Sequence, residues 1–125
     1  MSAPKPLSES TIQEQIVELL SRLSPGRFLF FSIPNSQFIS YLPKQTKIRM
    51  IAKLKRMGML PGAADLCIVC KGQTYFVEVK TEKGKQSENQ RLFQSLCHEM
   101  GAIYLLATSP EQVHRALRAW GIISY

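Results

Sequence analysis

Two apolar runs separated by Lys71-Gly72 constrain the fold of this chain more than any other feature. The runs extend from about Ala64 to Cys70 and from Gln73 to Thr81, which predicts two strands joined by a two-residue hairpin turn. Because side chains alternate between the two faces of a sheet, such a turn fixes which residues stand opposite each other. The predicted pairing begins with Cys70 opposite Gln73 and continues residue by residue along both strands.

The same register places Asp65 directly opposite Glu78 on one face of the hairpin. Their Cβ atoms would lie roughly 4.5 to 5.5 Å apart, where like charges repel unless a cation or a shared proton compensates. Two carboxylates in this relation suit Mg²⁺ or Mn²⁺, which prefer oxygen ligands. Lys80 follows two residues after Glu78 and projects from the same face. The alternative is a simple salt bridge between Lys80 and one acid, and a turn of different length would put the acids out of phase.

The remaining segments predict a mixed sheet flanked by helices, within a single domain that spans residues 1–125. Residues 1–7 are expected to form a flexible leader. Helical spacing and stop signals predict helices at about residues 8–23, 44–57, 87–100 and 110–120, whereas apolar runs at 27–33 and 102–107 predict strands. On the helix at 87–100 we expect five residues to face inward: Leu92, Phe93, Leu96, Cys97 and Met100.

The charge of the chain suits a polyanionic partner. Its 16 Lys and Arg residues exceed the 9 Asp and Glu residues, which gives a net charge of +7, and nucleic acid is the first candidate. The predicted helix at 44–57 carries cations on more than one face, so it either follows a phosphate backbone or is simply a solvated helix. The expected DNA contacts are Lys44, Lys47, Lys53 and Arg56.

Signals for membranes, secretion and disulfides are lacking. The apolar runs are far shorter than the roughly 20 residues of a membrane span, and "MSAPKPLSES" has no apolar h-region or cleavage pattern. We therefore expect no membrane partner and a cytoplasmic location. Three cysteines are too few for a disulfide scaffold. Cys67 and Cys70 would point to opposite faces of one strand, so they cannot share a metal ion.

The motifs "GAAD", "EVK" and "SENQ" together resemble the stand-alone VRR-NUC proteins of the PD-(D/E)xK nuclease superfamily, over about residues 9–106. The resemblance implies a restriction-endonuclease-like αβββαβ core, here with an added basic helix. It also implies that Asp65, Glu78 and the carbonyl of Val79 bind Mg²⁺, with Mn²⁺ as a substitute, while Lys80 positions the attacking water. The family usually has proline before the aspartate, where this chain has Ala64; proline stiffens that loop but supplies no ligand.

Nucleases of this superfamily often add a glutamate from the first helix. Glu9 lies on the same side of the predicted helix as Ile16, whereas Glu14 and Glu18 point almost opposite, so Glu9 is the expected site residue. Two other interpretations stay open at this point. In the first, Glu9 is an acid in the first turn that interacts favourably with the helix dipole. In the second, a capping box formed by Ser10–Gln13 leaves Glu9 just outside the helix.

Gln90 matches the family's helix glutamine that reaches the active site. Ser87 and Gln90 also have the spacing of a capping box, and the two roles are compatible. The resemblance thus implies a catalytic set and a metal-binding set. The catalytic set is Glu9, Asp65, Glu78, Lys80 and Gln90, and the metal set is Asp65, Glu78 and Val79.

The resemblance implies a Mg²⁺-dependent endodeoxyribonuclease that leaves 5′-phosphate and 3′-hydroxyl ends. Stand-alone members resemble dimeric enzymes that resolve four-way (Holliday) junctions, and two equivalent strands need two active sites, so we expect a homodimer on branched DNA. No segment of the sequence marks the interface, and the candidates are the basic helix and the loop before it, with Phe38 and Tyr41. The alternatives are a nuclease for flaps, forks or duplex DNA, and a DNA-binding module without catalysis. A bacterial or phage-infected cell is the expected setting.

Overall fold

The computed structural model describes residues 5–35 and 39–124 of the chain. Its eight elements follow the predicted order, namely α1 (Glu9–Leu23), β1 (Leu29–Ser32), α2 (Lys44–Arg56), β2 (Leu66–Cys70), β3 (Gln73–Val79), α3 (Glu88–Glu99), β4 (Ile103–Ala107) and α4 (Pro110–Ala119). The strands form one sheet in the order β1-β2-β3-β4, antiparallel except for the parallel β3–β4 pair. The predicted mixed sheet flanked by helices is therefore confirmed. None of the described helices is long and apolar enough to cross a membrane.

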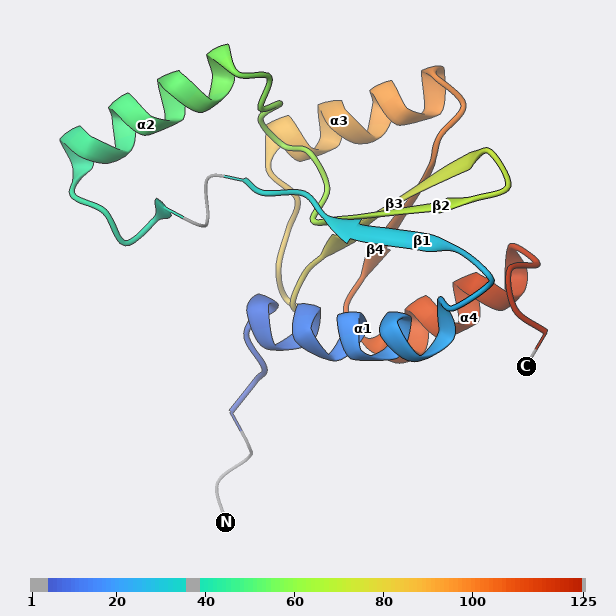
Figure 1. The fold of residues 1–125 in the computed structure, drawn as a ribbon. Coiled ribbons are helices and arrows are strands. Elements are labelled where there is room, and N and C mark those ends of the chain that lie inside the picture. Colours follow the sequence, from blue (N-terminus) through green and yellow to red (C-terminus); the bar gives the residue numbers. More distant parts are fainter. Residues whose placement is uncertain (1–4, 36–38, 125) are drawn as a thin grey trace.

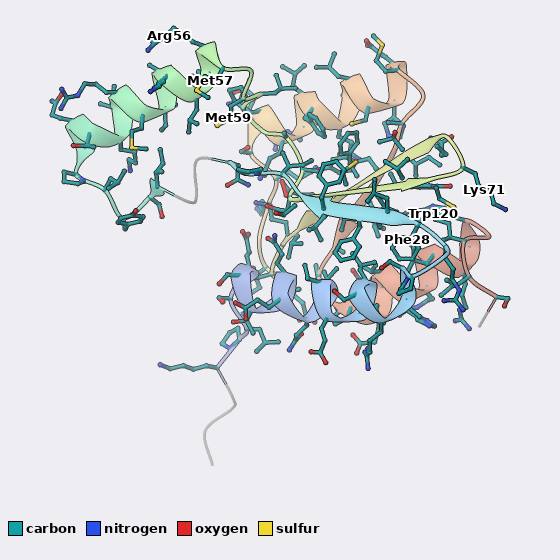
Figure 2. The ribbon with its side chains drawn as sticks, viewed as in Figure 1. Phe28, Arg56, Met57, Met59, Lys71 and Trp120 are labelled. Atoms are coloured by element: carbon teal, nitrogen blue, oxygen red, sulfur yellow. The ribbon has the colours of Figure 1, made fainter. Side chains whose placement is uncertain are left out.

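The β2–β3 hairpin has the predicted register. Cys70 pairs with Gln73 and Leu66 pairs with Val77, without an irregularity between them. Lys71 and Gly72 form the turn with φ angles of 48° and 81°, the two positive values that a type I′ turn requires. Figure 2 shows Lys71 at the tip of the hairpin, directed away from the sheet.

One face of the sheet carries the main core. Helices α1 and α4 cover this face, whereas α3 lies over the other (Figure 1). Fully buried Ile16, Leu20 and Leu117 pack from the helices against the sheet residues Leu66, Ile68 and Val77. The apolar spacing of α1 predicted this packing, because its buried residues recur every three or four positions.

The opposite face has a smaller core beneath α3. Phe93 and Cys97 are buried with Ala64, and Phe76 and Tyr104 pack against them from the sheet. The rings of Phe76 and Phe93 meet edge to face at 5.1 Å. The prediction that five residues of α3 face inward was partly wrong. Three of them are exposed, because α3 covers the sheet with a narrower stripe than its sequence suggested: Leu92 (58%), Leu96 (37%) and Met100 (80%).

Helix α2 stands apart from the sheet (Figure 1). None of its residues is buried. Its apolar side includes Ile48, which is 51% exposed, and the following Met57 is 72% exposed. The helix predicted at residues 44–57 is thus present, but none of its described apolar residues belongs to either core.

Candidate active site at the ends of β2 and β3

Asp65 and Glu78 lie together where β2 begins and β3 ends. Asp65 directly precedes β2, and the hairpin register brings it opposite Glu78. The backbone N–H of Val79 donates a 2.8 Å hydrogen bond to Oδ2 of Asp65. Both acids are nearly inaccessible, with exposed fractions of 6% and 1%. The predicted opposition of the two acids is therefore present in the structure.

The environment of Glu78 opposes its charge. Burial, a side-chain hydrogen bond with Asp65 and the charge of Asp65 raise the pKa of Glu78 from 4.5 to about 9, and Lys80 only partly counters this. Its Oε1 atom is buried without a hydrogen-bond partner among residues 5–35 and 39–124. A buried acid of this kind is stable only if it holds a proton or gains a cation, since an unpaired buried carboxylate is costly.

Lys80 forms its ion pair with Glu9, at 3.5 Å, rather than with either of the two buried acids. The simple salt bridge with one of those acids, which the sequence left open, is therefore not the arrangement seen. Glu9 is the first residue of α1, and the N-cap is Ser8, whose hydroxyl accepts a hydrogen bond from the N–H of Thr11. A capping box that leaves Glu9 outside the helix is thus excluded.

Glu9 is connected to the pair through Lys80, and its charge also contributes to the raised pKa of Glu78. Glu14 is exposed but lines the same cleft as Glu9 and Asp65, so the expectation that it points away from the site was wrong; Glu18 is exposed elsewhere. Glu18 lines a separate groove between α1 and α4 with three arginines. The choice of Glu9 from helical spacing therefore agrees with its position, whereas its part in the chemistry stays a prediction.

An open cleft of about 710 Å³ leads to Asp65 from the side of α1. Glu9 and Gln13 line it from the helix, and Asn35 lines it from the segment that follows β1. The amide Nδ2 of Asn35 donates a 3.2 Å hydrogen bond to Oδ1 of Asp65. Sequence reasoning treated this segment as a loop and missed Asn35; its only signal was a polar residue just beyond a strand end.

A second hollow of about 290 Å³ lies on the other side of Asn35, toward α2 and α3. Gln90 lines it, and the predicted capping box with Ser87 is present: Gln90 Oε1 accepts from the N–H of Ser87, and Ser87 Oγ accepts from the N–H of Gln90. Lys55 reaches this hollow from α2. Gln90 therefore caps α3 and also lies near the cleft, while a role for it in the chemistry stays a prediction.

Gly62 sets how closely α3 approaches the loop before Asp65. Its φ of +84° is unfavourable for other residues, and a Cβ here would clash with the backbone of Asn89 at the start of α3. Ala64 takes the position where proline was expected, and it is fully buried in the smaller core. The loop is thus fixed by glycine and by packing, although it lacks the proline.

The cations predicted to contact DNA lie along α2. Lys44, Lys53 and Arg56 are exposed and Lys47 is half-buried, so all four are accessible to a ligand. Figure 2 shows Arg56 beside Met57 at the end of this projecting helix. Of the residues expected at a dimer interface, Tyr41 is 81% exposed, and Phe38 lies outside the described residues.

The donor set at the site suits a hard cation. Within the described part of the chain, no group of three or more His, Cys, Asp and Glu side chains could hold a metal ion. Mg²⁺ does not need such a cage, because it commonly uses one or two carboxylates with water and substrate oxygens. Asp65, the unpartnered oxygen of Glu78 and the Val79 carbonyl would meet that need.

Two solved structures share this architecture. A structure described as a VRR_NUC domain protein superposes with a TM-score of 0.70 and 17% sequence identity, over 94% of this chain and 90% of its own. The chain has the VRR-NUC fold. A second structure, described as a VRR_NUC domain, superposes with a TM-score of 0.60 and 21% identity, over 90% of this chain and 96% of its own. No protein-family model and no curated protein sequence matches the chain.

The VRR-NUC fold gives the same order of elements that the motifs implied. At identities of 17% and 21% the likeness concerns the fold alone. Function must therefore be argued from the side chains of this chain. Those side chains are Asp65, Glu78 and Lys80 at the strand ends, with Glu9 and Asn35 around them.

Proposed function

We propose that this chain is a Mg²⁺-dependent nuclease that hydrolyses phosphodiester bonds of DNA. The observation that carries the proposal is the buried pair of Asp65 and Glu78, in which Glu78 Oε1 has no hydrogen-bond partner among the described residues. Burying two acids side by side destabilises a fold unless a proton or a cation compensates, and acids perturbed in this way cluster at functional sites. The VRR-NUC fold and the net charge of +7 support a nucleic-acid substrate.

In this proposal Asp65, Glu78 and the Val79 carbonyl hold the metal ion. When bound, Mg²⁺ polarises the scissile phosphate and stabilises the charge that develops on it. Lys80 holds the attacking water beside the acids and favours its deprotonated form, because an ammonium group stabilises a nearby negative charge. Glu9 keeps the Lys80 ammonium at the mouth of the cleft through their ion pair.

The preferred substrate is proposed to be a four-way DNA junction, cut by a homodimer that supplies one active site to each of two strands. The exposed apolar residues of α2 and Tyr41 support an interface with a second copy, since exposed apolar clusters mark interaction sites. The cations Lys44, Lys47, Lys53 and Arg56 would contact phosphates. Flap, fork and duplex nucleases use the same chemistry, so substrate comparison must separate them.

The test is cleavage of an end-labelled four-way junction by purified protein with Mg²⁺, with a chelator, and by two variants. We expect cleavage only with Mg²⁺, and we expect Asp65→Ala and Glu78→Gln each to reduce the single-turnover rate by about 100-fold or more. Glu99→Gln is the matched control, because Glu99 is an exposed acid at the end of α3. If Asp65→Ala cleaves the junction at the wild-type rate, the assignment of the active site is wrong.

The same assay distinguishes the substrates and the inactive alternative. Matched linear duplex, flap and fork DNA with the same sequence are compared with the junction. If one of these substrates is cleaved faster than the junction, it replaces the junction as the proposed substrate, and the proposed chemistry is unchanged. Binding without cleavage in either Mg²⁺ or Mn²⁺ would leave a DNA-binding module as the function.

A further inference from the structure

Asn35 is anchored beside Asp65 by the backbone before it. Strand β1 ends at Ser32, and the N–H of the next residue, Ile33, donates a 2.8 Å hydrogen bond to the carbonyl of Asp65. Pro34 then restricts the chain, because its ring fixes φ. The main chain that presents the Asn35 amide is therefore tied to the main chain that presents the Asp65 carboxylate.

The two oxygens of Asp65 have different donors. Oδ2 accepts from the N–H of Val79 at 2.8 Å, and Oδ1 accepts from Nδ2 of Asn35 at 3.2 Å. The donors belong to segments on opposite sides of the carboxylate, the end of β3 and the segment after β1. One donor on each oxygen fixes the rotation of the carboxylate plane. Because each oxygen has two lone pairs, the carboxylate keeps capacity for the side-chain hydrogen bond with Glu78 in metal-free protein, or for a metal ion in its place.

We infer that Asn35 is a positioning residue, which orients the Asp65 carboxylate so that it and Glu78 present oxygens to the same divalent metal ion. The inference rests on the proposed function. Asn35 lines both the cleft that leads to Asp65 and the hollow toward α2 and α3, so its amide lies at the approach to the acids. Without the amide, Asp65 would keep the Val79 donor and its side-chain hydrogen bond with Glu78, but Oδ1 would lose the donor that fixes it from the segment after β1.

Metal ligands depend on such partners. Hydrogen-bond donors behind a ligating group orient it, and their removal commonly weakens metal binding about 10- to 100-fold. The Asn35 effect is therefore expected in the affinity for the metal itself, before any substrate is present. This separates a positioning role from a general effect on DNA binding.

The experiment measures Mn²⁺ affinity of the DNA-free protein by the electron paramagnetic resonance signal of free Mn²⁺. Wild-type protein should bind Mn²⁺ saturably, and Asn35→Ala should raise the dissociation constant about 10-fold or more. Asn35→Gln, which retains an amide donor, should regain part of the loss. Gln15→Ala is the control, because Gln15 is an exposed amide in the groove between α1 and α4 and lines neither hollow beside Asn35, so its loss should leave Mn²⁺ affinity unchanged.

Thermal unfolding shows whether each variant is folded. If Asn35→Ala does not fold, Asn35→Leu replaces it, since leucine is close in size and has no donor. Wild-type affinity in a folded variant without the donor would overturn the role of Asn35 alone. If the wild-type protein does not bind Mn²⁺ saturably, the proposed metal site is wrong. The same holds if Asp65→Ala binds Mn²⁺ as tightly as the wild type.

Discussion

Glu9 Oε1 lies 3.5 Å from Nζ of Lys80, so the first residue of α1 is paired with the residue that directly follows β3. The lysine is 10% exposed and the glutamate 32% exposed. The pair joins a helix on one face of the sheet to the strand end that carries Glu78. It holds the Lys80 ammonium group near the two buried acids, although Lys80 forms its ion pair with Glu9.

Replacing Glu9 by glutamine should slow cleavage more than it destabilises the fold. Lys80 loses its partner and its fixed position, so the single-turnover rate should fall about 10-fold or more, while the partly exposed pair contributes under about 1 kcal/mol to stability. Single-turnover kinetics and denaturant unfolding measure the two effects. Glu18→Gln, on the exposed side of α1, should change neither, and an unchanged rate for Glu9→Gln would exclude Glu9 from the site.

The raised pKa of Glu78 predicts a pH dependence of stability in metal-free protein. In the folded state Glu78 keeps its proton up to a pKa of about 9, whereas the unfolded chain releases it near the ordinary 4.5. The folded state therefore binds more protons between these values, and this contribution to stability, complete below the lower value, falls as pH rises through the window. The loss amounts to at most about 1.4 kcal/mol per pH unit.

The measurement is denaturant unfolding of wild type and Glu78→Gln in a chelator, at several pH values. The difference between the two proteins isolates Glu78 from the other titrating groups. We expect wild type to lose stability relative to Glu78→Gln as the pH rises, and Mg²⁺ to reverse this at the alkaline end, because metal binds the deprotonated acid. A difference that does not vary with pH would contradict the assigned environment of Glu78.

The hairpin could be predicted from sequence because its geometry is local. Two residues of turn, both able to adopt positive φ, decide the register, and the register decides that Asp65 and Glu78 face each other. The α1 acids were sorted by similar reasoning, since helical spacing alone separates Glu9 from Glu18. Short-range periodicity was therefore sufficient to predict that Asp65 faces Glu78 and that Glu9 lies near them.

The parts that sequence reasoning missed depend on contacts between distant segments. Asn35 reaches Asp65 across 30 residues of chain, and nothing around Asn35 marks that partner. In the sequence, nothing distinguishes Lys55 from the other cations of its helix. In the structure it lines a hollow together with residues at the start of α3. Leu92 on α3 was expected inside because apolar spacing gives the apolar side of a helix, but not how much of it a neighbour covers.

Lys55 is expected to contribute to DNA binding, although it was not among the cations chosen from sequence. It lines the hollow beside Asn35 and Gln90, and Asn35 also lines the cleft at Asp65, so we expect DNA bound at the cleft to extend past its ammonium group. In the Asp65→Ala background, Lys55→Ala should weaken junction binding and reduce the slope of log affinity against log salt by about one. Arg49→Ala, an exposed cation on the same helix, should have a smaller effect. Equal effects would contradict a path through the hollow.

Self-association is expected through α2. Ile48 is half exposed on a helix without buried residues, so Ile48→Asp should leave the monomer folded and convert a dimer to monomer. Sedimentation equilibrium measures the state. Leu92→Asp tests the exposed stripe of α3 in the same way, and dissociation by this variant alone would place the interface on α3. A wild-type monomer at micromolar concentration would exclude the proposed homodimer.

The most direct measurement is an anomalous difference map from crystals grown or soaked with Mn²⁺, collected from wild type and Asp65→Ala. We expect a wild-type peak bounded by the Asp65 and Glu78 carboxylates and the Val79 carbonyl, and no such peak in the variant. A wild-type map without a peak between the two acids, at a Mn²⁺ concentration that supports cleavage, would contradict the account.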